Sequence, residues 1–367
     1  MGDIMPGGTF SDRAAELIPH AVPDDAAPWL AADVTLANLE AAGSNRGQPM
    51  PDKILVYALP ESLEVLPRLG VTAVNLANNH SFDYGPEGLE DTKAILRSMG
   101  IGYFGAGMDL EEAGAPWLGD TPTGTVAALG FSWTTEWVQS APAATETTPG
   151  INPLRMDHVH QSIRSVRREH DPDLLVVSLH WGEGMSRYPR PDAVGQAHAM
   201  LASGADIVMG HHPHCLQPYE QTNDGIVFYS LGNFIASPYR RTEGARLTYG
   251  EGEPRTRTLR ERQTVVVNVT VDGDGSKEVG YLPLVQDREV PVLHLANERD
   301  ESQIRQAFET RSRVLGSPKY RVRYGYLRRV DEINSKIEAV REEGFGALSW
   351  KTPFRAIRRL ITGRNLH

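Results

Sequence analysis

The chain has 367 residues, with 37 Lys and Arg against 47 Asp and Glu, and its net charge is −10. Hydrophobic residues make up 40% and charged residues 23%, a balance that supports a large core and excludes disordered, collagen-like and coiled-coil chains. The single cysteine, Cys215, excludes an internal disulfide. No run approaches the roughly 20 apolar residues of a membrane span, and the first residues lack the basic and apolar regions of a signal peptide. We therefore expect a cytoplasmic α/β protein with no nucleic-acid partner.

Short β-branched runs alternate with helix-like segments along the chain, which is typical of a layered α/β fold. The predicted strands are Val34–Leu39, Val71–Leu76, Thr125–Gly130, Leu174–Leu179, Asp206–Met209, Ile226–Ser230 and Thr264–Val271. One helix is predicted from Pro86 to Gly100 and another from Pro191 to Ser203, because proline favours the first turn and glycine follows the last. Residues 135–160 and 237–262 are predicted to be long polar loops.

The charge is unevenly distributed between the body of the chain and its C-terminal part. Residues 301–367 contain 15 Lys and Arg against 7 Asp and Glu, whereas the rest of the chain is acidic. We therefore predict a domain over residues 1–299 and a basic, mainly helical extension over residues 300–367. Apolar residues at helical spacing near the C-terminus suit packing on the chain's own domain, and they also suit contact with a membrane surface or an anionic partner. These residues are Phe354, Ile357, Leu360 and Ile361.

Polar side chains follow several of the predicted strands at the point where each strand ends. They are Asn38, Glu40, Asn79, His80, His180, His211, His212 and His214, and Asp3 stands at the start of the chain. Open α/β sheets bind ligands at the carboxyl ends of their strands, so we expect these side chains to converge. Carboxylate, amide and imidazole ligands together suit Mn²⁺, Fe or Zn²⁺ better than Ca²⁺. His80, with Asp83 three residues later, suits proton donation to a leaving group.

The motifs resemble those of the CapA family, the poly-γ-glutamate capsule-type proteins. They are residues 2–5 (GDIM), 38–40 (NLE), 78–85 (NNHSFDYG), 180–182 (HWG), 210–214 (GHHPH) and 229–234 (YSLGNF). The resemblance implies a calcineurin-like metallophosphoesterase fold, an α/β fold in which a β-sandwich is flanked by helices. It places Asp3, Glu40, Asn79, His180, His212 and His214 at metal-site positions, His80 at the general-acid position and Asp83 as the partner of His80. Met5 stands where such enzymes usually have a histidine, and Glu40 stands where a bridging Asp is usual.

Three functions remain open, and the favoured one acts on a peptide or poly-amino-acid substrate. The favoured one, by resemblance to soluble lasso-peptide epimerases, is inversion of a C-terminal residue by Asp3 and His294, for which a metal is dispensable. Its enolate and carboxylate would be held by Arg187, Arg190, Asn38 and His211. The second is a metal-dependent phosphoesterase or related hydrolase. The third is an accessory role in poly-γ-glutamate capsule biosynthesis.

Overall fold

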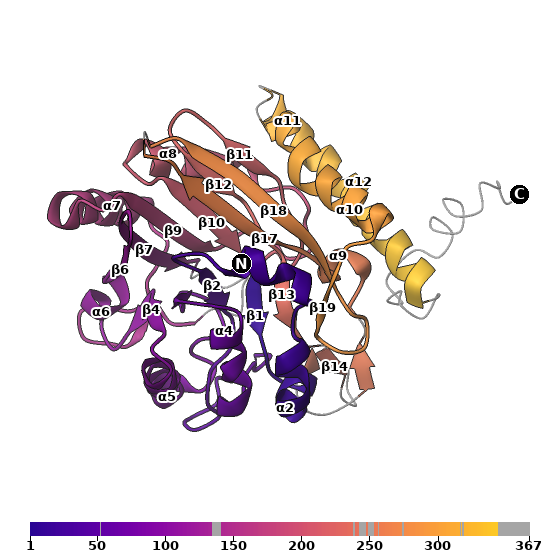
Figure 1. Ribbon diagram of the computed structural model, residues 1–367, viewed down its shortest axis with the longest axis horizontal. Coiled ribbons are helices and arrows are strands. Elements are labelled where there is room, and N and C mark those ends of the chain that lie inside the picture. The colour runs from indigo at the N-terminus through magenta and orange to yellow at the C-terminus, as the bar shows by residue number, and fades with distance from the viewer. Residues whose placement is uncertain are drawn as a thin grey trace, which may run out of the picture.

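Two sheets packed face to face form the centre of the protein, and helices cover their outer sides (Figure 1). The computed structural model describes residues 1–343 apart from 52, 134–140, 238, 242–246, 249–252, 256, 274, 316 and 318. The predicted helix around Phe354 to Ile361 therefore lies outside the described residues. None of the helices in the described part of the chain combines the length and apolar character that crossing a bilayer requires.

The first sheet has five parallel strands in the order β13-β1-β2-β3-β4. Its strands are β1 (Asp3–Met5), β2 (Leu36–Leu39), β3 (Ala73–Asn75), β4 (Gly102–Phe104) and β13 (Asn233–Ala236). All five strands have only three or four residues, so they carry little periodicity of their own. Position in this sheet therefore depends on the neighbouring strands rather than on local sequence.

The second sheet has six strands in the order β11-β12-β10-β9-β7-β6, with four parallel strands in the middle and an antiparallel strand at each edge. Its strands are β6 (Trp117–Thr121), β7 (Gly124–Ser132), β9 (Leu174–His180), β10 (Ile207–His211), β11 (Tyr219–Gln221) and β12 (Ile226–Phe228). Its central strands are long apolar runs because both faces of the sheet are covered.

Three apolar clusters account for the layers. One cluster lies between the two sheets, for example at Leu36, Val176 and Met209. A second cluster joins the five-stranded sheet to the helices outside it, namely α2 (Ala14–Leu17), α3 (Ala27–Leu30), α4 (Val65–Arg68) and α5 (Gly85–Ser98). A third joins the six-stranded sheet to α7 (Met156–His170), α8 (Pro191–Ala202) and the first turn of α12 (Tyr320–Glu343).

The remaining elements close the ends of the sandwich. An antiparallel sheet of β17 (Gln263–Val271), β18 (Lys277–Gln286) and β19 (Leu293–Leu295) is followed by α10 (Glu298–Arg305), a π-helical turn (Gln306–Thr310) and α11 (Ser312–Leu315). The smaller strands are β5 (Ala106–Gly107), β8 (Gly150–Ile151), β14 (Tyr239–Arg241), β15 (Leu247–Thr248) and β16 (Glu253–Arg255). The short helices are α1 (Thr9–Asp12), α6 (Leu110–Gly114), α9 (Leu259–Arg262) and 3₁₀ turns at Ile18–His20, Asp24–Ala26 and Pro60–Glu64.

The predicted α/β class is confirmed, and each of the seven predicted strands coincides with an observed strand. The two predicted helices correspond to α5 and α8, which begin within a residue of the expected prolines. The two predicted loops are wrong in part. Residues 135–160 include β8 and the start of α7, and residues 237–262 include three short strands and α9. These elements pack in tertiary contacts that their polar sequences do not reveal.

Candidate functional site

The candidate site lies where the inward-facing positions of the central strands change from apolar to polar. Side chains of a strand alternate between its two faces, so every second residue faces the layer between the sheets. Leu36 belongs to the central apolar cluster, and the next positions of the same face are Asn38 and Glu40. Val176 is likewise followed on its face by His180, and Met209 by His211. The apolar layer between the two sheets therefore ends in a group of polar side chains.

Asp3 lies in the middle of a row of polar residues on three neighbouring strands. The register pairs it with Asn38 on one side and with Asn233 on the other. Asn38 Nδ2 donates to Asp3 Oδ1 at 2.9 Å, and His211 Nδ1 lies 3.0 Å from the same oxygen. Burial alone would raise the pKa of Asp3, but the hydrogen bond and charge of His211 and the charge of His214 lower it below its usual value. Asp3 is therefore an oriented carboxylate with its partners in place.

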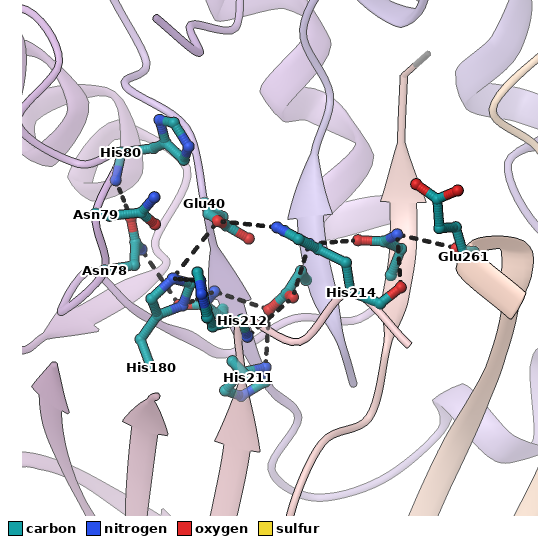
Figure 2. Close-up of polar contacts among 12 residues, drawn as sticks. Glu40, Asn78, Asn79, His80, His180, His211, His212, His214 and Glu261 are labelled. Carbon is teal, nitrogen blue, oxygen red and sulfur yellow. Dashed lines mark hydrogen bonds and ion pairs between the residues drawn. The ribbon is translucent and has the colours of Figure 1, made fainter. Parts of the chain in front are cut away.

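Glu40 is the opposite case, a buried carboxylate with neither oxygen hydrogen-bonded within the described residues. Its Oε1 lies 3.5 Å from Nε2 of His180 and 3.8 Å from Nε2 of His214 (Figure 2). Burial, reinforced by the charge of Asp3, raises the pKa of Glu40 well above its usual value. Burying a carboxylate without hydrogen bonds costs free energy, so the presence of one here needs an explanation.

Three imidazoles surround that carboxylate. Nδ1 of His212 lies 3.1 Å from Nε2 of His180, too close for both rings to be protonated comfortably. Burial, with the charges of the other histidines, lowers the pKa of His180 well below its usual value and that of His212 to about 3. The rings are therefore neutral at physiological pH, which is the protonation state that binds metals.

The turn that carries His212 and His214 is strained. Their φ angles are 93° and 55°, in the left-handed region that non-glycine residues rarely adopt. Such a conformation costs about 1–3 kcal/mol per residue and is typical of functional sites. Asn233 holds the imidazole ring of His214 in place, because Oδ1 of Asn233 lies 2.9 Å from Nδ1 of that ring. This leaves Nε2 of His214 pointing toward Glu40.

The donor atoms form two overlapping sets that suit a metal ion. One set is Asp3, Glu40 and His180, the other is Glu40, His212 and His214, and within each set the donor atoms lie within 4.8 Å of one another. Glu40 belongs to both sets, and neither of its oxygens has a hydrogen bond to the residues that the structure describes. Mixed oxygen and imidazole donors fit Mn²⁺, Fe or Zn²⁺. Met5 is wholly buried in the apolar cluster under α2 to α5 and adds no imidazole.

A second polar group lies beside the site on the loop after β3. Nδ1 of His80 lies 2.8 Å from Oδ2 of Asp83, as the sequence suggested. Lys53 Nζ lies 2.6 Å from the other oxygen of Asp83, and the backbone N–H of Val56 also donates to this carboxylate. The Lys53 ammonium in addition donates to the backbone carbonyl of Asn79. Lys53 is therefore a buried link between the His80–Asp83 pair and the loop of Asn79.

The same loop is shaped by Asn78, whose Oδ1 accepts hydrogen bonds from the backbone N–H groups of His80 and Ser81. Nδ2 of Asn78 donates to the backbone carbonyl of Leu39, which ties the loop to the residue before Glu40. In Figure 2 this loop lies on one side of Glu40 and His214 lies on the other. The Oδ1 of Asn79 is buried without a hydrogen bond in the described chain, and so it is a further free oxygen donor at this edge.

Comparison with known proteins identifies the family. Residues 1–238 match the family described as "Bacterial capsule synthesis protein PGA_cap". The chain belongs to this family. It is 33% identical over 225 residues to a "Capsule biosynthesis protein CapA" of Bacillus anthracis, an alignment that covers 60% of this chain and 52% of the relative. It is 33% identical over 233 residues to a "PGA biosynthesis protein CapA" of Bacillus subtilis, covering 63% of this chain and 56% of the relative.

A further relative is named as a probable polyglutamine synthesis accessory protein of Mycobacterium tuberculosis, with 31% identity over 217 residues and 56% of each chain covered. The chain thus spans about half the length of the curated relatives that it matches. Two solved structures are similar at low identity. A hypothetical protein of Thermus thermophilus has a TM-score of 0.46 at 14% identity, covering 78% of this chain and 98% of that one. A phosphatase of Mycoplasma pneumoniae has a TM-score of 0.43 at 12% identity, covering 82% and 94%.

Within this PGA_cap chain, the structure corrects several predicted substrate contacts. Asn38 and His211 are wholly buried behind Asp3, so they orient the carboxylate and leave no surface for a substrate. Arg187 faces helix α12, where its Nη1 lies 3.6 Å from Glu338. Arg190 does border the cavity beside His212.

The predicted catalytic role of His294 is also not supported by its position. His294 is exposed on β19, the edge strand of the separate antiparallel sheet. Among the described residues, no hydrogen bond or ion pair joins it to Asp3 or to the other histidines of the site. A two-base mechanism needs both groups at the same substrate carbon, and this arrangement does not provide it.

Sequence reasoning missed three residues of the site region. Asn233 was visible as part of the motif at 229–234, but its role in holding His214 was not. Lys53 lies in a stretch without a motif, so no sequence signal marks it. Arg257 lies in the predicted loop beyond the family match and is buried. Its positive charge lowers the pKa of Glu40 against the larger effect of burial, and at His214 it adds to burial, which also lowers the pKa.

Proposed function

We propose that this chain acts in the assembly of a poly-γ-glutamate-type capsule as a metal-dependent hydrolase of a glutamyl polymer or peptide. The relatives named for capsule and PGA biosynthesis support the capsule context. The single observation that carries the chemistry is Glu40, whose two buried oxygens lack hydrogen bonds among the described residues and lie beside neutral imidazoles.

The residues that would hold a divalent metal are Asp3, Glu40, His180, His212 and His214, with Asn79 as a further oxygen donor. When bound, the metal supplies a Lewis acid and an activated water, the needs of a hydrolytic reaction. The protein's own contribution is orientation. Asn38 and His211 fix Asp3, and Asn233 fixes His214.

His80 supplies the proton donor of this proposal. Its ring is held by Asp83, and its loop lies beside Glu40 (Figure 2). A histidine held in this way at the edge of the site suits protonation of a leaving group.

The epimerase hypothesis has less support. Asp3 accepts hydrogen bonds from Asn38 and His211, and its pKa is lowered, so it is a weak base. The relatives are named for capsule synthesis and as accessory proteins rather than as isomerases.

The test is to incubate the chain with a γ-linked glutamyl oligomer in D₂O, with Mn²⁺ or with a chelator, and to analyse the products by mass spectrometry. We expect shortened oligomers only with the metal, and their loss in the Glu40→Gln and His80→Ala variants. Deuterium at an α-carbon that persists with the chelator would instead favour the epimerase. Intact oligomers under all metal conditions would contradict hydrolysis and leave an accessory role in capsule assembly.

A further inference from the structure

A cavity of about 700 Å³ opens directly beside the two donor sets formed by Asp3, Glu40, His180, His212 and His214. It meets the cluster at His212 and extends away along the segment after the His180-Trp-Gly motif. The residues around it come from this segment, from α8 and from α12. They include Glu183, Arg190, Asp192 and Gln196, with Trp133 and His212 from the turns after β7 and β10 beside them. One wall is therefore built by a helix that lies beyond the family match at residues 1–238.

The residues that α12 contributes to the cavity lie on one face of the helix. Arg328, Asp331, Glu332 and Ser335 lie three, four and seven residues apart, which places them side by side on a helix. Hydrogen bonds from two arginines of the domain hold the helix in place. Asp331 accepts from the backbone N–H of Arg187 at 2.9 Å, and Glu338 accepts from Nε of the buried Arg260 at 2.9 Å. The helix is thus docked in one rotation, and the wall is a built feature of the site.

The two arginines of the cavity form ion pairs whose carboxylates a bound ligand can replace with its own. Arg328 Nε lies 2.9 Å from Glu183, and Arg190 binds Asp192 through two hydrogen bonds. The Arg328 side chain is 55% exposed and that of Arg190 40%. Ion pairs this exposed contribute only about 0–1 kcal/mol, so another carboxylate can replace Glu183 or Asp192 at little cost. The other two acids of the lining have their own cations, Asp331 with Arg260 and Glu332 with Lys336.

The remaining features suit a peptide chain with acidic groups. Guanidinium groups bind carboxylates through two parallel hydrogen bonds, and the two arginines come from different elements, Arg190 from the residue before α8 and Arg328 from α12. Oε1 of Gln196 is buried without a hydrogen bond in the described chain, so it is free to accept from an amide N–H. Arg190 stacks 5.2 Å above the ring of Trp133, which gives one end of the cavity a flat aromatic surface.

We infer that this cavity is the substrate-binding cleft and that Arg328 of α12, with Arg190, selects peptide chains that bear free carboxylates. The inference rests on the proposed function, because it names the ligand of the same site. It also assigns a role to the basic C-terminal extension: one of its arginines faces the substrate, while its acidic residues fasten the helix to the domain.

The test is calorimetric binding of γ-linked pentaglutamate to the full chain, which needs no turnover. We expect Arg328→Gln to weaken binding at least about tenfold, since it removes a charged hydrogen-bonding partner. Arg323→Gln, with the same change of charge at an exposed position about 140° around the same helix, should change affinity less than about twofold. Glu183→Gln removes the internal competitor of the ligand and should tighten binding several-fold.

The γ-linked peptide in which every free carboxylate is amidated provides the second arm, and it should bind weakly to wild type and equally weakly to Arg328→Gln. No binding of pentaglutamate to wild type, or equal binding by wild type and Arg328→Gln, would overturn the inference. Thermal unfolding of each variant checks that the fold is retained. Binding that depends on Arg328 without any hydrolysis would contradict the proposed reaction and leave the cleft assignment standing.

Discussion

Two groups of charged residues border the cavity, one through Asp331 and the other through His212, and they differ in how their charges are satisfied. In the arginine network, Arg260 contacts both Asp331 and Glu338, and Arg187 contacts Glu338. In the carboxylate–histidine cluster, defined by Asp3, Glu40, His180, His212 and His214, two carboxylates face neutral imidazoles, and Glu40 has no hydrogen bond within the part of the chain that the structure describes. The first group has opposite charges in contact, whereas the second lacks a positive charge at its centre.

The difference separates a structural role from a functional one. A buried ion pair keeps its shape without help, and breaking it destabilises the fold. A buried carboxylate without a partner is destabilising until something binds to it, so its retention indicates a ligand site. The following substitutions test this contrast.

The largest effect on stability is expected from the arginine network. Arg260→Met leaves Asp331 and Glu338 without their shared cation, and we expect unfolding free energy to fall by about 3 kcal/mol. Urea denaturation measures this change. The matched control is Arg305→Met, which breaks exposed pairs with Glu301 and Glu309 and should cost less than about 1 kcal/mol. Equal costs for the two variants would contradict a structural role of the network.

The next effect concerns the orientation of the cluster. Asn38→Ala removes the hydrogen bond to Asp3 and the contact of 3.3 Å with Nδ1 of His180. Residues that orient metal ligands typically contribute 10–100-fold to affinity, so we expect Mn²⁺ or Zn²⁺ to bind at least about tenfold more weakly. Isothermal calorimetry measures the change. Affinity within about twofold of wild type would show that Asp3 needs no such support.

The buried lysine beside the cluster should affect stability without removing the metal site. Lys53→Met leaves Asp83 with His80 and the Val56 N–H as partners, and we expect about 2 kcal/mol of lost stability. Metal affinity should stay within about threefold, because Lys53 belongs to neither donor set. A large loss of metal affinity with unchanged stability would reverse this assignment.

The smallest effect on stability is expected at Glu40 itself. Its pKa is raised mainly by burial and then by Asp3, and it makes no hydrogen bond in the described chain, so Glu40→Gln removes no existing hydrogen bond. We expect the unfolding free energy of the metal-free protein to change by less than about 1 kcal/mol, or to rise. Destabilisation by about 3 kcal/mol would mean that Glu40 has a structural partner and would remove the contrast between the two groups.

The sequence allowed most of the central fold and the main cluster to be predicted, for a physical reason. The strands at Leu174–His180 and Ile207–His211 are apolar runs that end in histidines, and both features are local. Their convergence follows from the parallel arrangement of the strands. The partners of the cluster could not be predicted in this way, because the contact of Lys53 with Asp83 and that of Arg328 with Glu183 exist only in the folded chain. The position of His294 could not be predicted for the same reason, because it depends on which sheet strand β19 joins.

The most direct test of the account is the binding of Mn²⁺ or Zn²⁺ to the chelator-treated protein, measured by calorimetry for wild type and Glu40→Gln. Glu40 belongs to both donor sets, so the account predicts that its replacement weakens binding by more than about 100-fold, while the exposed control Glu301→Gln binds like wild type. Equal metal binding by wild type and Glu40→Gln, or no binding by wild type, would contradict the claim that Glu40 is the centre of a metal site.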